Sequence, residues 1–466
     1  MQIPILSGIY CNSASDFRRS YPRNLVPIIQ ANGISNGYLR PADGIVEFAT
    51  GVGSDRGGIE WNGTLYRVMG TKLVSVSSTG TVTDLGDVGG SGQVTFDYSF
   101  DRLAIASSGK LFYWNGTTLT QVTDTELGTV VDFVWVDGYF FTTDGEFLIT
   151  TDINDPMSVS PFRYASSELD PDPIEALIKF KNEVYALNRH SIEVFTNIGG
   201  TGFPFQRVDG ARIQRGSVGT FTCALYLDTI AFVGGGRNEQ NSVYLIANGN
   251  TVKIATREID QILAQYDEST LAGALVESRL HDGLQHLYIH LPDKTLVYDG
   301  ASSQVAQEAV WFILTSSIVG DGQYRARNFI FAYNKWICGD TNTNKLGYVS
   351  NEVSSHWGDA NGWQFETQTI FNENKGMIFH ELELVSLTGN VPLGDDPTIW
   401  ASYSIDGVTW SQEKPYKAGK IGYRSKKINW LQQGFVRDWS VRRFRGTSDS
   451  HLSMARLEAR IEPLAW

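Results

Sequence analysis

The chain has 466 residues, a formal net charge of −13 and 19% charged residues, together with 47 glycines and 12% aromatic residues. This acidic balance argues against a protein that grips nucleic acid by neutralising phosphates, and no run of about 18 apolar residues is present that would span a membrane. The three cysteines are far apart and odd in number, which indicates neither a disulfide framework nor a CxxC metal site. The first residues, MQIPILSGIY, lack the pattern of a secretory signal, so we expect the protein to fold in a reducing cytosol.

The segment 36–45, NGYLRPADGI, combines two turn signals with a rigid step. Its Asn-Gly and Asp-Gly pairs favour tight turns with positive φ, and its proline forces the preceding arginine into an extended conformation. Residues 45–49 (IVEFA) then alternate apolar and polar side chains, which predicts a strand. The residues of this motif are Asn36, Gly37, Tyr38, Leu39, Arg40, Pro41, Asp43 and Gly44.

From Gly57 onward one pattern recurs: an apolar strand, a polar turn, and a second strand rich in aromatic residues. Repeats of about 40–50 residues, each with several short strands, are the signature of a β-propeller. Seven such hairpins predict six or seven blades, and an irregular all-β array is the alternative. The copies lie at residues 59–76, 98–116, 133–150, 178–195, 224–235, 284–300 and 330–340.

A helical insert interrupts the repeats at residues 257–273 (REIDQILAQYDESTLAG). Its apolar residues recur at helical spacing, and Asp267 or Ser269 is suited to cap a second short helix. We expect this insert to lie between two blades, on one face of the ring.

After about residue 357 the strands become longer and alternate apolar and polar residues, which predicts a C-terminal β-sandwich of roughly 100 residues. We therefore expect an all-β chain with an N-terminal arm at 1–50, a propeller at 51–356 and a sandwich at 357–466. The sandwich carries four arginines that can contact an acidic partner, although solvated strand edges explain them equally well. They are Arg437, Arg442, Arg443 and Arg445.

Motifs that carry chemistry are weak in this sequence. The segment SIDGVTW (404–410) approaches the Asp-box of sialidase propellers, but it is one residue short and lies outside the repeats. His286 and His290 share one face of a strand and lie near Asp293, yet no third strong metal ligand is evident. No phosphate loop or GxSxG motif is present. We expect no catalytic residue, no metal and no cofactor.

Three stretches, in this order, carry a resemblance to a known family: 36–45 with 58–73, the insert with 284–304, and the C-terminal 426–446 (KKINWLQQGFVRDWSVRRFRG). They resemble the packaged DNA stabilisation proteins, or tail hubs, of lambdoid short-tailed bacteriophages. The resemblance spans nearly the whole chain, from about Phe17 to Ile461, whereas the segments 150–175 and 391–425 diverge.

The resemblance implies a non-enzymatic component of the virion tail that is made in the host cytoplasm. Copies of the chain, expected to number six, would form a ring below the head-to-tail adaptor protein, extend the tail channel and seat the tail needle. Tailspikes would attach around this region. The packaged DNA would pass through the channel without tight binding.

Two hypotheses follow for the opening motif and for the function. A propeller closes its ring by taking a strand from one terminus into the blade begun by the other, so we expect residues 45–49 to complete the last blade and residues 1–35 to remain free to dock on a neighbour.

The functional alternatives to a tail hub are a carbohydrate-binding or carbohydrate-degrading propeller, with Trp357, Trp363 and Trp410 as candidate sugar platforms, and a protein-interaction propeller of the host.

Overall fold

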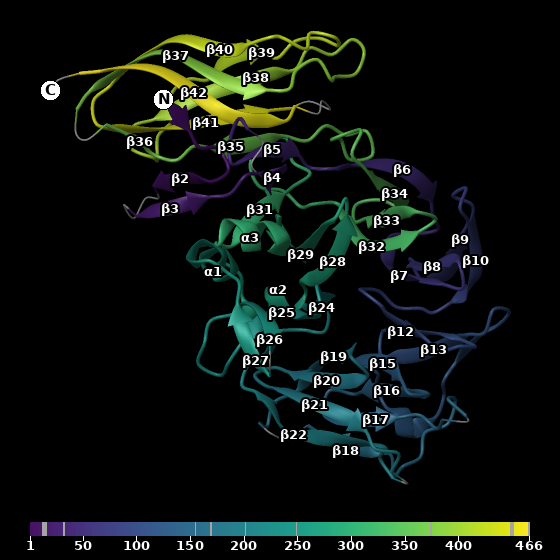
Figure 1. Cartoon of the computed structure of the whole chain (residues 1–466). Coiled ribbons are helices and arrows are strands. Elements are labelled where there is room, and N and C mark those ends of the chain that lie inside the picture. The colour runs from purple at the N-terminus through teal and green to yellow at the C-terminus, as the bar shows by residue number, and fades with distance from the viewer. Residues whose placement is uncertain are drawn as a thin grey trace. The chain divides into compact units, whose positions relative to one another are not determined.

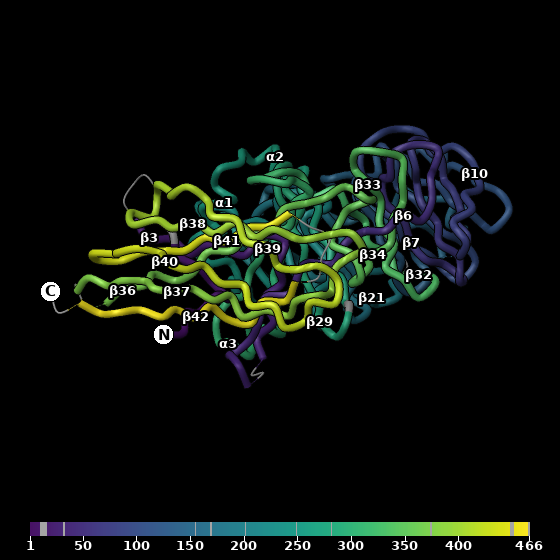
Figure 2. The backbone as a smooth tube through the Cα atoms, turned by 90° about the horizontal axis from the view of Figure 1, so that it is seen from above, coloured from purple at the N-terminus to yellow at the C-terminus, as the bar shows by residue number. Residues whose placement is uncertain are grey.

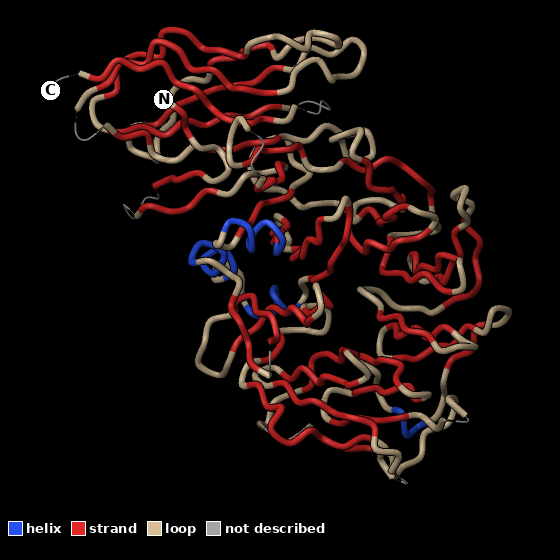
Figure 3. Tube along the Cα trace, viewed as in Figure 1, coloured by secondary structure: helices blue, strands red, loops and turns tan. Residues whose placement is uncertain are grey.

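The computed structural model describes residues 1–11, 16–30, 33–153, 155–167, 170–200, 202–247, 249–372, 375–447 and 452–464. The chain forms two compact units: unit 1 comprises residues 1–46, 293–324 and 349–466, and unit 2 comprises residues 47–292 and 325–348. Strands dominate both units (Figure 3), which confirms the prediction of an all-β chain. The described helices are short: η1 (Thr125–Leu127), α1 (Arg257–Leu263), α2 (Glu268–Ala272) and α3 (Gly300–Ala306).

Unit 2 is a β-propeller, with its sheets set around a common centre (Figure 1). The innermost strands contact one another in a closed cycle in the order β7, β11, β15, β19, β24, β28, β32 and back to β7. The described part of the chain therefore has seven inner strands, in agreement with the prediction of six or seven blades. Their bounds are β7 (Asp55–Trp61), β11 (Thr95–Tyr98), β15 (Asp132–Val136), β19 (Ile174–Phe180), β24 (Cys223–Tyr226), β28 (Leu275–His281) and β32 (Ala326–Ala332).

Each inner strand begins an antiparallel sheet whose further strands follow in chain order. The next strands of the first four sheets are β8 (Thr64–Met69), β9 (Lys72–Val76) and β10 (Val82–Asp87); β12 (Leu103–Ser107), β13 (Lys110–Trp114) and β14 (Leu119–Gln121); β16 (Tyr139–Thr143), β17 (Phe147–Thr150) and β18 (Tyr164–Ser166); and β20 (Glu183–Asn188), β21 (Ile192–Asn197) and β22 (Phe205–Ile213). In the fifth sheet, β23 (Gly216–Ser217) and β24 both pair with β25 (Thr229–Gly235), which is followed by β26 (Ser242–Ala247) and β27 (Asn250–Lys253). Strand β28 pairs with β29 (Leu284–His290), and β32 with β33 (Lys335–Asp340), which pairs with β34 (Lys345–Ser350).

Tight turns join the first and second strands of most blades, and their residues adopt the left-handed conformation. Asn62, Asp137, Asn182 and Asn334, four of the polar residues that mark the sequence repeat, have φ between 48° and 64°. Two-residue hairpin loops need positive φ to match the right-handed twist of their strands, and asparagine and aspartate tolerate it well. This need explains why the copies share a polar turn although they share few other residues.

Strand β6 (Gly44–Thr50) ends the sheet in the order β32-β33-β34-β6, and the next strand in the chain is β7 of the first blade. Within unit 2, the amide of Gly51 donates to the carbonyl of Asn344 at 2.8 Å, and Lys345 Nζ lies 2.7 Å from Glu47 Oε2. The side chain of Ala49 is buried in a cluster with Leu65, Val76, Ile337 and Leu346. The expected strand at 45–49 therefore lies beside the last blade, where it joins the two ends of the propeller.

Two short helices follow β27, as the sequence predicts for residues 257–273. Asp267 caps α2 by accepting a hydrogen bond from the amide of Thr270 at 2.8 Å. The cap of α1 is Thr256, which the sequence reasoning did not identify. Helix α3 was also missed: it begins at an N-cap, Asp299, directly after the strand it follows, where the sequence predicted only a hairpin.

Unit 1 contains the β-sandwich, whose strands run side by side in Figure 2. One sheet has the order β4-β5-β42-β37-β40, with β1 paired to β42; the other has the order β35-β41-β38-β39, with β36 paired to β41. Unit 1 also contains the pair β2–β3 and the pair β30–β31. The bounds are β1 (Gln2–Ile3), β2 (Gly8–Cys11), β3 (Phe17–Ser20), β4 (Leu25–Ile29), β5 (Gly37–Pro41), β30 (Thr295–Asp299), β31 (Val310–Leu314), β35 (Trp363–Glu366), β36 (Ile370–Phe371), β37 (Met377–Ser386), β38 (Thr398–Ser404), β39 (Lys414–Lys417), β40 (Ile428–Val436), β41 (Trp439–Gly446) and β42 (Met454–Pro463).

The N-terminal segment is part of the sandwich, so the expectation that residues 1–35 are free to dock on a neighbour is wrong. Strand β1 pairs with β42, and β4 pairs with β5 along five residue pairs. Ile3, Leu25 and Leu39 are at most 1% exposed and belong to one core with Phe379 and Phe444. Burial of these apolar side chains, worth about 1.5–3 kcal/mol each, holds the segment in place.

Candidate functional site

The opening motif anchors the chain in the sandwich unit before it enters β6. Gly37 has a φ of 154°, and a Cβ there would lie 2.3 Å from the carbonyl oxygen of Ile28, so only glycine fits this hairpin between β4 and β5. Arg40 forms an ion pair of 3.1 Å with the nearly buried Asp43. The amide of Gly44 then donates to the carbonyl of Val353 at 2.8 Å. The motif thus fixes the chain to unit 1 through its backbone and one ion pair.

Three of the four arginines singled out in the sequence contact groups of the sandwich itself. Arg442 is 2% exposed, its guanidinium lies over the rings of Phe379 and Tyr403 at 4.6 and 5.0 Å, and burial lowers its pKa to about 10. A cation is not easily accommodated in such a core without aromatic faces or acceptors. The structure therefore places Arg442 among packing residues.

Arg443 and Arg445 lie on the same strand and each has a carboxylate partner. Arg443 Nε donates to Glu366 at 2.8 Å and its guanidinium stacks 3.5 Å over Trp410. Arg445 binds Glu413 through two hydrogen bonds of 2.6 Å. Arg437, at the turn between β40 and β41, is exposed. Of the four, Arg437 has the side chain most accessible to another molecule.

A set of acidic residues that the sequence reasoning missed links consecutive blades. The carboxylate of Asp97 accepts a hydrogen bond from the amide of Trp135 at 2.5 Å, and that of Asp132 accepts from Leu177 at 2.8 Å. In each case the acid lies on one inner strand and the amide on the next. Burial raises the pKa of both carboxyls, to about 7 for Asp132.

The same arrangement recurs further round the ring, where Glu277 of β28 accepts from the amides of Asn328 and Phe329 at 3.1 and 2.8 Å. Asp97, Asp132 and Glu277 each lie four or five residues before a polar turn residue, Asp101, Asp137 or Asp282. This spacing is the pattern by which the sequence could have identified these acidic residues. The carboxylates join blades by satisfying amides that the sheets leave unpaired.

A buried ion pair within the first blade is joined to the last blade by hydrogen bonds. Arg67 and Asp55 have side chains that are 0% and 2% exposed, with Nη1 2.8 Å from Oδ1. Arg67 also donates to the carbonyls of Asn328 and Ile337, and Asn328 Nδ2 donates to Asp55 at 2.8 Å. Burial raises the pKa of Asp55 above its ordinary value, against the lowering effect of Arg67. The hydrogen bonds of Arg67 and Asp55 to the last blade join the two ends of the propeller.

The histidines of β29 are structural in this arrangement. His290 is 1% exposed and its Nε2 lies 2.8 Å from Glu277, and burial lowers its pKa. Among the described residues no group of three or more His, Cys, Asp or Glu side chains is placed to hold a metal ion. In the Asp-box-like segment, Asp406 accepts from the amides of Val408 and Thr409 and so organises a turn.

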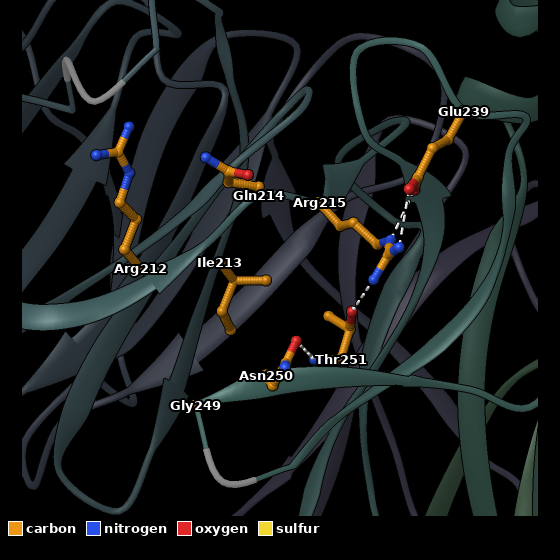
Figure 4. A pocket seen from close by; sticks show the side chains of 8 residues that line it. All are labelled: Arg212, Ile213, Gln214, Arg215, Glu239, Gly249, Asn250 and Thr251. Atoms are coloured by element: carbon orange, nitrogen blue, oxygen red, sulfur yellow. Dashed lines mark hydrogen bonds and ion pairs between the residues drawn. The ribbon is translucent and has the colours of Figure 1, made fainter.

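Two adjoining pockets lie at the outer strands of the fourth and fifth blades. The first, of about 360 Å³, is shown in Figure 4, where Arg215 points to Glu239 and Thr251 while Arg212 points away from them. The second, of about 400 Å³, shares Arg215 and Glu239 and adds Asp260. Arg215 binds Glu239 at 2.6 and 2.8 Å.

The carboxylates of these pockets are poorly suited to acid catalysis. The hydrogen bond from Arg215 lowers the pKa of Glu239, and Asp260 accepts from Lys253 Nζ at 2.5 Å. A general acid in a glycosidase needs a raised pKa. Two of the three candidate sugar platforms are equally poor: Trp363 is 5% exposed, and Arg443 covers the ring of Trp410. Within the described residues no helix is long and apolar enough to cross a membrane.

Comparison with known proteins finds a relative that matches this chain over nearly its full length. It is 27% identical to the tail hub protein gp10 of Salmonella phage P22 over 487 aligned positions, which cover 99% of each protein. Among solved structures, the WD40 domain of Neurospora crassa Pan2 is 9% identical with a TM-score of 0.43, covering 66% of this chain and 95% of that one. PorZ of Porphyromonas gingivalis is 12% identical with a TM-score of 0.41, covering 79% and 46%.

Two family models match in sequence order. The model described as Bacteriophage P22 Gp10, beta-propeller, matches residues 1–354, and the model described as Bacteriophage P22 Gp10, beta-sandwich, matches residues 362–462. Together they cover both parts of the fold described above. The chain belongs to the phage P22 Gp10 family, the DNA stabilisation and tail hub proteins built from a propeller and a C-terminal sandwich.

Proposed function

We propose that this protein is a structural tail hub of a short-tailed phage virion. The observation that carries the proposal is the full-length relationship to the tail hub protein of phage P22, which includes both the propeller and the sandwich. In this function the chain forms a ring of six copies below the head-to-tail adaptor, extends the tail channel and retains the packaged DNA. It also seats the tail needle and lies beside the tailspikes.

We further propose that the protein acts without catalysis or cofactor. Two features of the site support this: the carboxylates of the two pockets are held by Arg215 and Lys253, and the inner-strand carboxylates hold blades together. A carbohydrate-degrading propeller would need a free pair of carboxylates in a pocket. We also propose the division of the chain into an N-terminal arm with the ring-closing strand at 1–50, a propeller at 51–356 and a sandwich at 357–466. Arg437 is the candidate contact with a partner.

The experiment is to assemble particles with and without the chain. Heads filled in its absence should package DNA and then lose it, and added purified protein should restore retention. The amount of nuclease-protected DNA per particle measures both steps. Particles that keep their genome without the protein would contradict the proposed function, and hydrolysis of a surface polysaccharide by the purified chain would favour the alternative.

We propose that the subunit is monomeric alone and forms its ring on the adaptor. Repulsion between copies that each carry a charge of −13 opposes free association, although salt screens it beyond about 8–10 Å. A ring formed on a template acquires closed cyclic symmetry from it. Sedimentation of the purified chain at physiological salt tests this, and a stable ring without any partner would contradict it.

A further inference from the structure

Charge is distributed very unevenly along this chain. Residues 357–466 contain 13 basic and 13 acidic residues, so residues 1–356 carry the whole net charge of −13. Within the sandwich, the segment 414–427 (KPYKAGKIGYRSKK) contains six basic residues and no acidic one. Within the propeller, residues 111–162 contain eight acidic residues and no lysine, arginine or histidine. The chain thus carries two segments of opposite sign.

The basic segment forms an exposed surface at one end of the sandwich. It begins with β39, the edge strand of its sheet, and continues through the loop to β40. Its exposed side chains include Ile421 and Tyr423, at 52% and 60%. We call this surface the basic tip; its residues are Lys414, Lys417, Lys420, Ile421, Tyr423, Arg424, Lys426 and Lys427.

Most of the charge on the basic tip is not neutralised by the sandwich. Lys417 pairs with Asp396 at 3.0 Å and Lys427 with Glu383 at 3.5 Å. No ion pair of Lys414, Lys420 or Arg424 is found within the described part of the chain. The loop 387–393 packs against the tip through a hydrogen bond from Thr388 Oγ1 to the carbonyl of Tyr423, and it adds the exposed side chain of Leu393.

The acidic segment forms a surface from three neighbouring loops of the second and third blades. Asp124 accepts a hydrogen bond from the amide of Val159 at 3.0 Å, which joins the turn of η1 to the loop after β17. A Cβ on Gly128 would lie 3.8 Å from Asp144 Oδ2, so the turn between β16 and β17 is also adjacent. We call this surface the acidic surface; its residues are Asp124, Glu126, Asp144, Glu146 and Asp155.

The acidic surface resembles the tip in two respects: it is not neutralised, and it carries apolar side chains. None of its five carboxylates forms an ion pair among the residues that the structure describes. Phe162 and Ile153, in the loop that Asp124 holds, are 80% and 49% exposed. A protein interface commonly combines an apolar centre with a charged rim.

We propose that the basic tip of one copy docks on the acidic surface of a second copy of this chain. The two surfaces have opposite charge, most of the charged groups of each form no ion pair in their own unit, and both include exposed apolar side chains that a contact would bury. A contact between two different surfaces is heterologous, and such a contact repeated around an axis generates a ring where the rotation closes, as a ring-shaped template would impose. The inference rests on the proposed ring assembly and identifies the surfaces that form it.

The docking between the basic tip and the acidic surface should be weak and sensitive to salt. Rim charges set register and the rate of association more than affinity, and their attraction weakens with salt. The docking is therefore weak between free subunits at physiological salt. It becomes stable when the adaptor holds neighbouring copies side by side, because the contact is then effectively intramolecular.

Cross-linking between isotopically distinct copies tests the docking. Full-length chains labelled with ¹⁴N and ¹⁵N are mixed at high concentration and low salt, and a carbodiimide is used to join lysines to carboxylates that touch. Mass spectrometry should find peptides of mixed label that connect Lys414 or Lys420 to Glu126, Glu146 or Asp155. The same links should form in assembled particles.

Charge reversal supplies the matched variants. Lys414→Glu with Lys420→Glu and Arg424→Glu should lower the yield of mixed-label links by about tenfold or more, because attraction at the rim becomes repulsion. Mixing this variant with Glu126→Lys, Asp144→Lys and Glu146→Lys should restore links between the two different chains. Lys375→Glu with Arg460→Glu, also exposed on the sandwich, is the control and should leave the yield unchanged.

Several outcomes would overturn the docking. Links confined to single-label peptides would show contact within one copy only, and normal ring assembly by the tip-reversed variant would show that other surfaces form the ring. Saturable binding of duplex DNA or of an acidic tail protein to the tip, without inter-copy links, would give the surface another occupant. In each case particles that lose DNA only when the chain is absent would leave the hub function standing.

Discussion

The carboxylate of Asp132 in the third blade accepts a hydrogen bond from the backbone amide of Leu177 in the fourth, at 2.8 Å. The same carboxylate accepts from Thr95 Oγ1 of the second blade, also at 2.8 Å. One buried side chain therefore touches three consecutive blades. Its ionisation state affects the stability of the ring, because an ionised carboxylate in this position has little contact with solvent.

Replacing Asp132 by asparagine should flatten the dependence of stability on pH. Burial, with a contribution from the charge of Asp97, raises the pKa of Asp132 to about 7, above its ordinary value of 3.8. Between those values the folded state holds a proton that the unfolded chain has lost, so stability falls as pH rises, by up to about 1.4 kcal/mol per pH unit. Asp132→Asn keeps an acceptor and does not titrate, so its gain in melting temperature over the native chain should be larger at pH 8 than at pH 5, because the native chain loses stability across that interval.

Differential scanning calorimetry at both pH values measures this difference. Asp137→Asn is the matched control, because it removes one acidic group from an exposed turn directly after the same strand. It should shift the melting temperature equally at both pH values. An Asp132→Asn protein whose melting temperature followed the native pH profile would show that this carboxylate does not change its charge in that range.

Breaking the ion pair between Asp55 and Arg67 should destabilise the propeller strongly. Arg67→Met leaves the carboxylate of Asp55 buried without its cation, a change that typically costs 3–5 kcal/mol, about the loss expected here. Asp55→Asn with Arg67→Met should recover part of that loss, because the buried charge is then absent. Urea denaturation followed by tryptophan fluorescence measures both. Equal loss in the single and double variants would indicate that packing, and not charge, is what Arg67 supplies.

The propeller could be predicted from the sequence because its turns impose a chemical requirement. Asn62, Asp137 and Asn334 recur because positive φ suits few residue types, and the strands around them follow the alternation of buried and exposed faces. For the sixth blade, the sequence predicted the repeat one strand too far along the chain. Its first turn is Asp282-Gly283, with φ of 51° and 74°, whereas the copy predicted at 284–300 begins only with the second strand, β29.

Long-range pairings could not be predicted in this way. Nothing in the local pattern of residues 1–29 indicates that Gln2 pairs with Glu458, or that Ile3 and Leu25 join a core built mainly by the other end of the chain. Arg442 shows the same limit for charge: Arg443 follows it in the sequence, but in the fold its guanidinium lies over the rings of Phe379 and Tyr403. Which charges remain exposed depends on partners that sequence proximity does not reveal.

Closure of the propeller by β6 should make Ala49 sensitive to charge. Its side chain is 8% exposed and packs in the cluster shared by the first and last blades, whereas the next residue, Thr50, is exposed. Ala49→Glu would bury an unpaired carboxylate and should cost about 2–4 kcal/mol. Thr50→Glu adds the same charge to solvent and should change stability by about 0.5 kcal/mol or less. Thermal unfolding followed by circular dichroism compares them, and identical melting curves would show that β6 contributes little to the closed ring.

The hub should retain DNA without binding it. The chain carries −13 overall, and two of the six cations of the basic tip, Lys417 and Lys427, already pair with carboxylates. Proteins that bind duplex DNA non-specifically neutralise several phosphates and reach dissociation constants of about 10⁻⁴ to 10⁻⁶ M at physiological salt. We expect weaker binding than this, because repulsion by the remaining acidic surface opposes approach. A wall that bound phosphates would also slow passage of the genome, since each neutralised phosphate adds affinity.

Fluorescence anisotropy of a labelled duplex, titrated with the purified chain across a series of salt concentrations, measures this binding. No saturable signal should appear near physiological salt, and any signal at low salt should vanish in the variant with Lys414, Lys420 and Arg424 changed to glutamate, because those cations are the least compensated. Retention would then have to come from sealing the lower end of the tail by a partner. Tight binding with a steep salt dependence would contradict this mechanism, because the protein would then hold the genome directly through its phosphates.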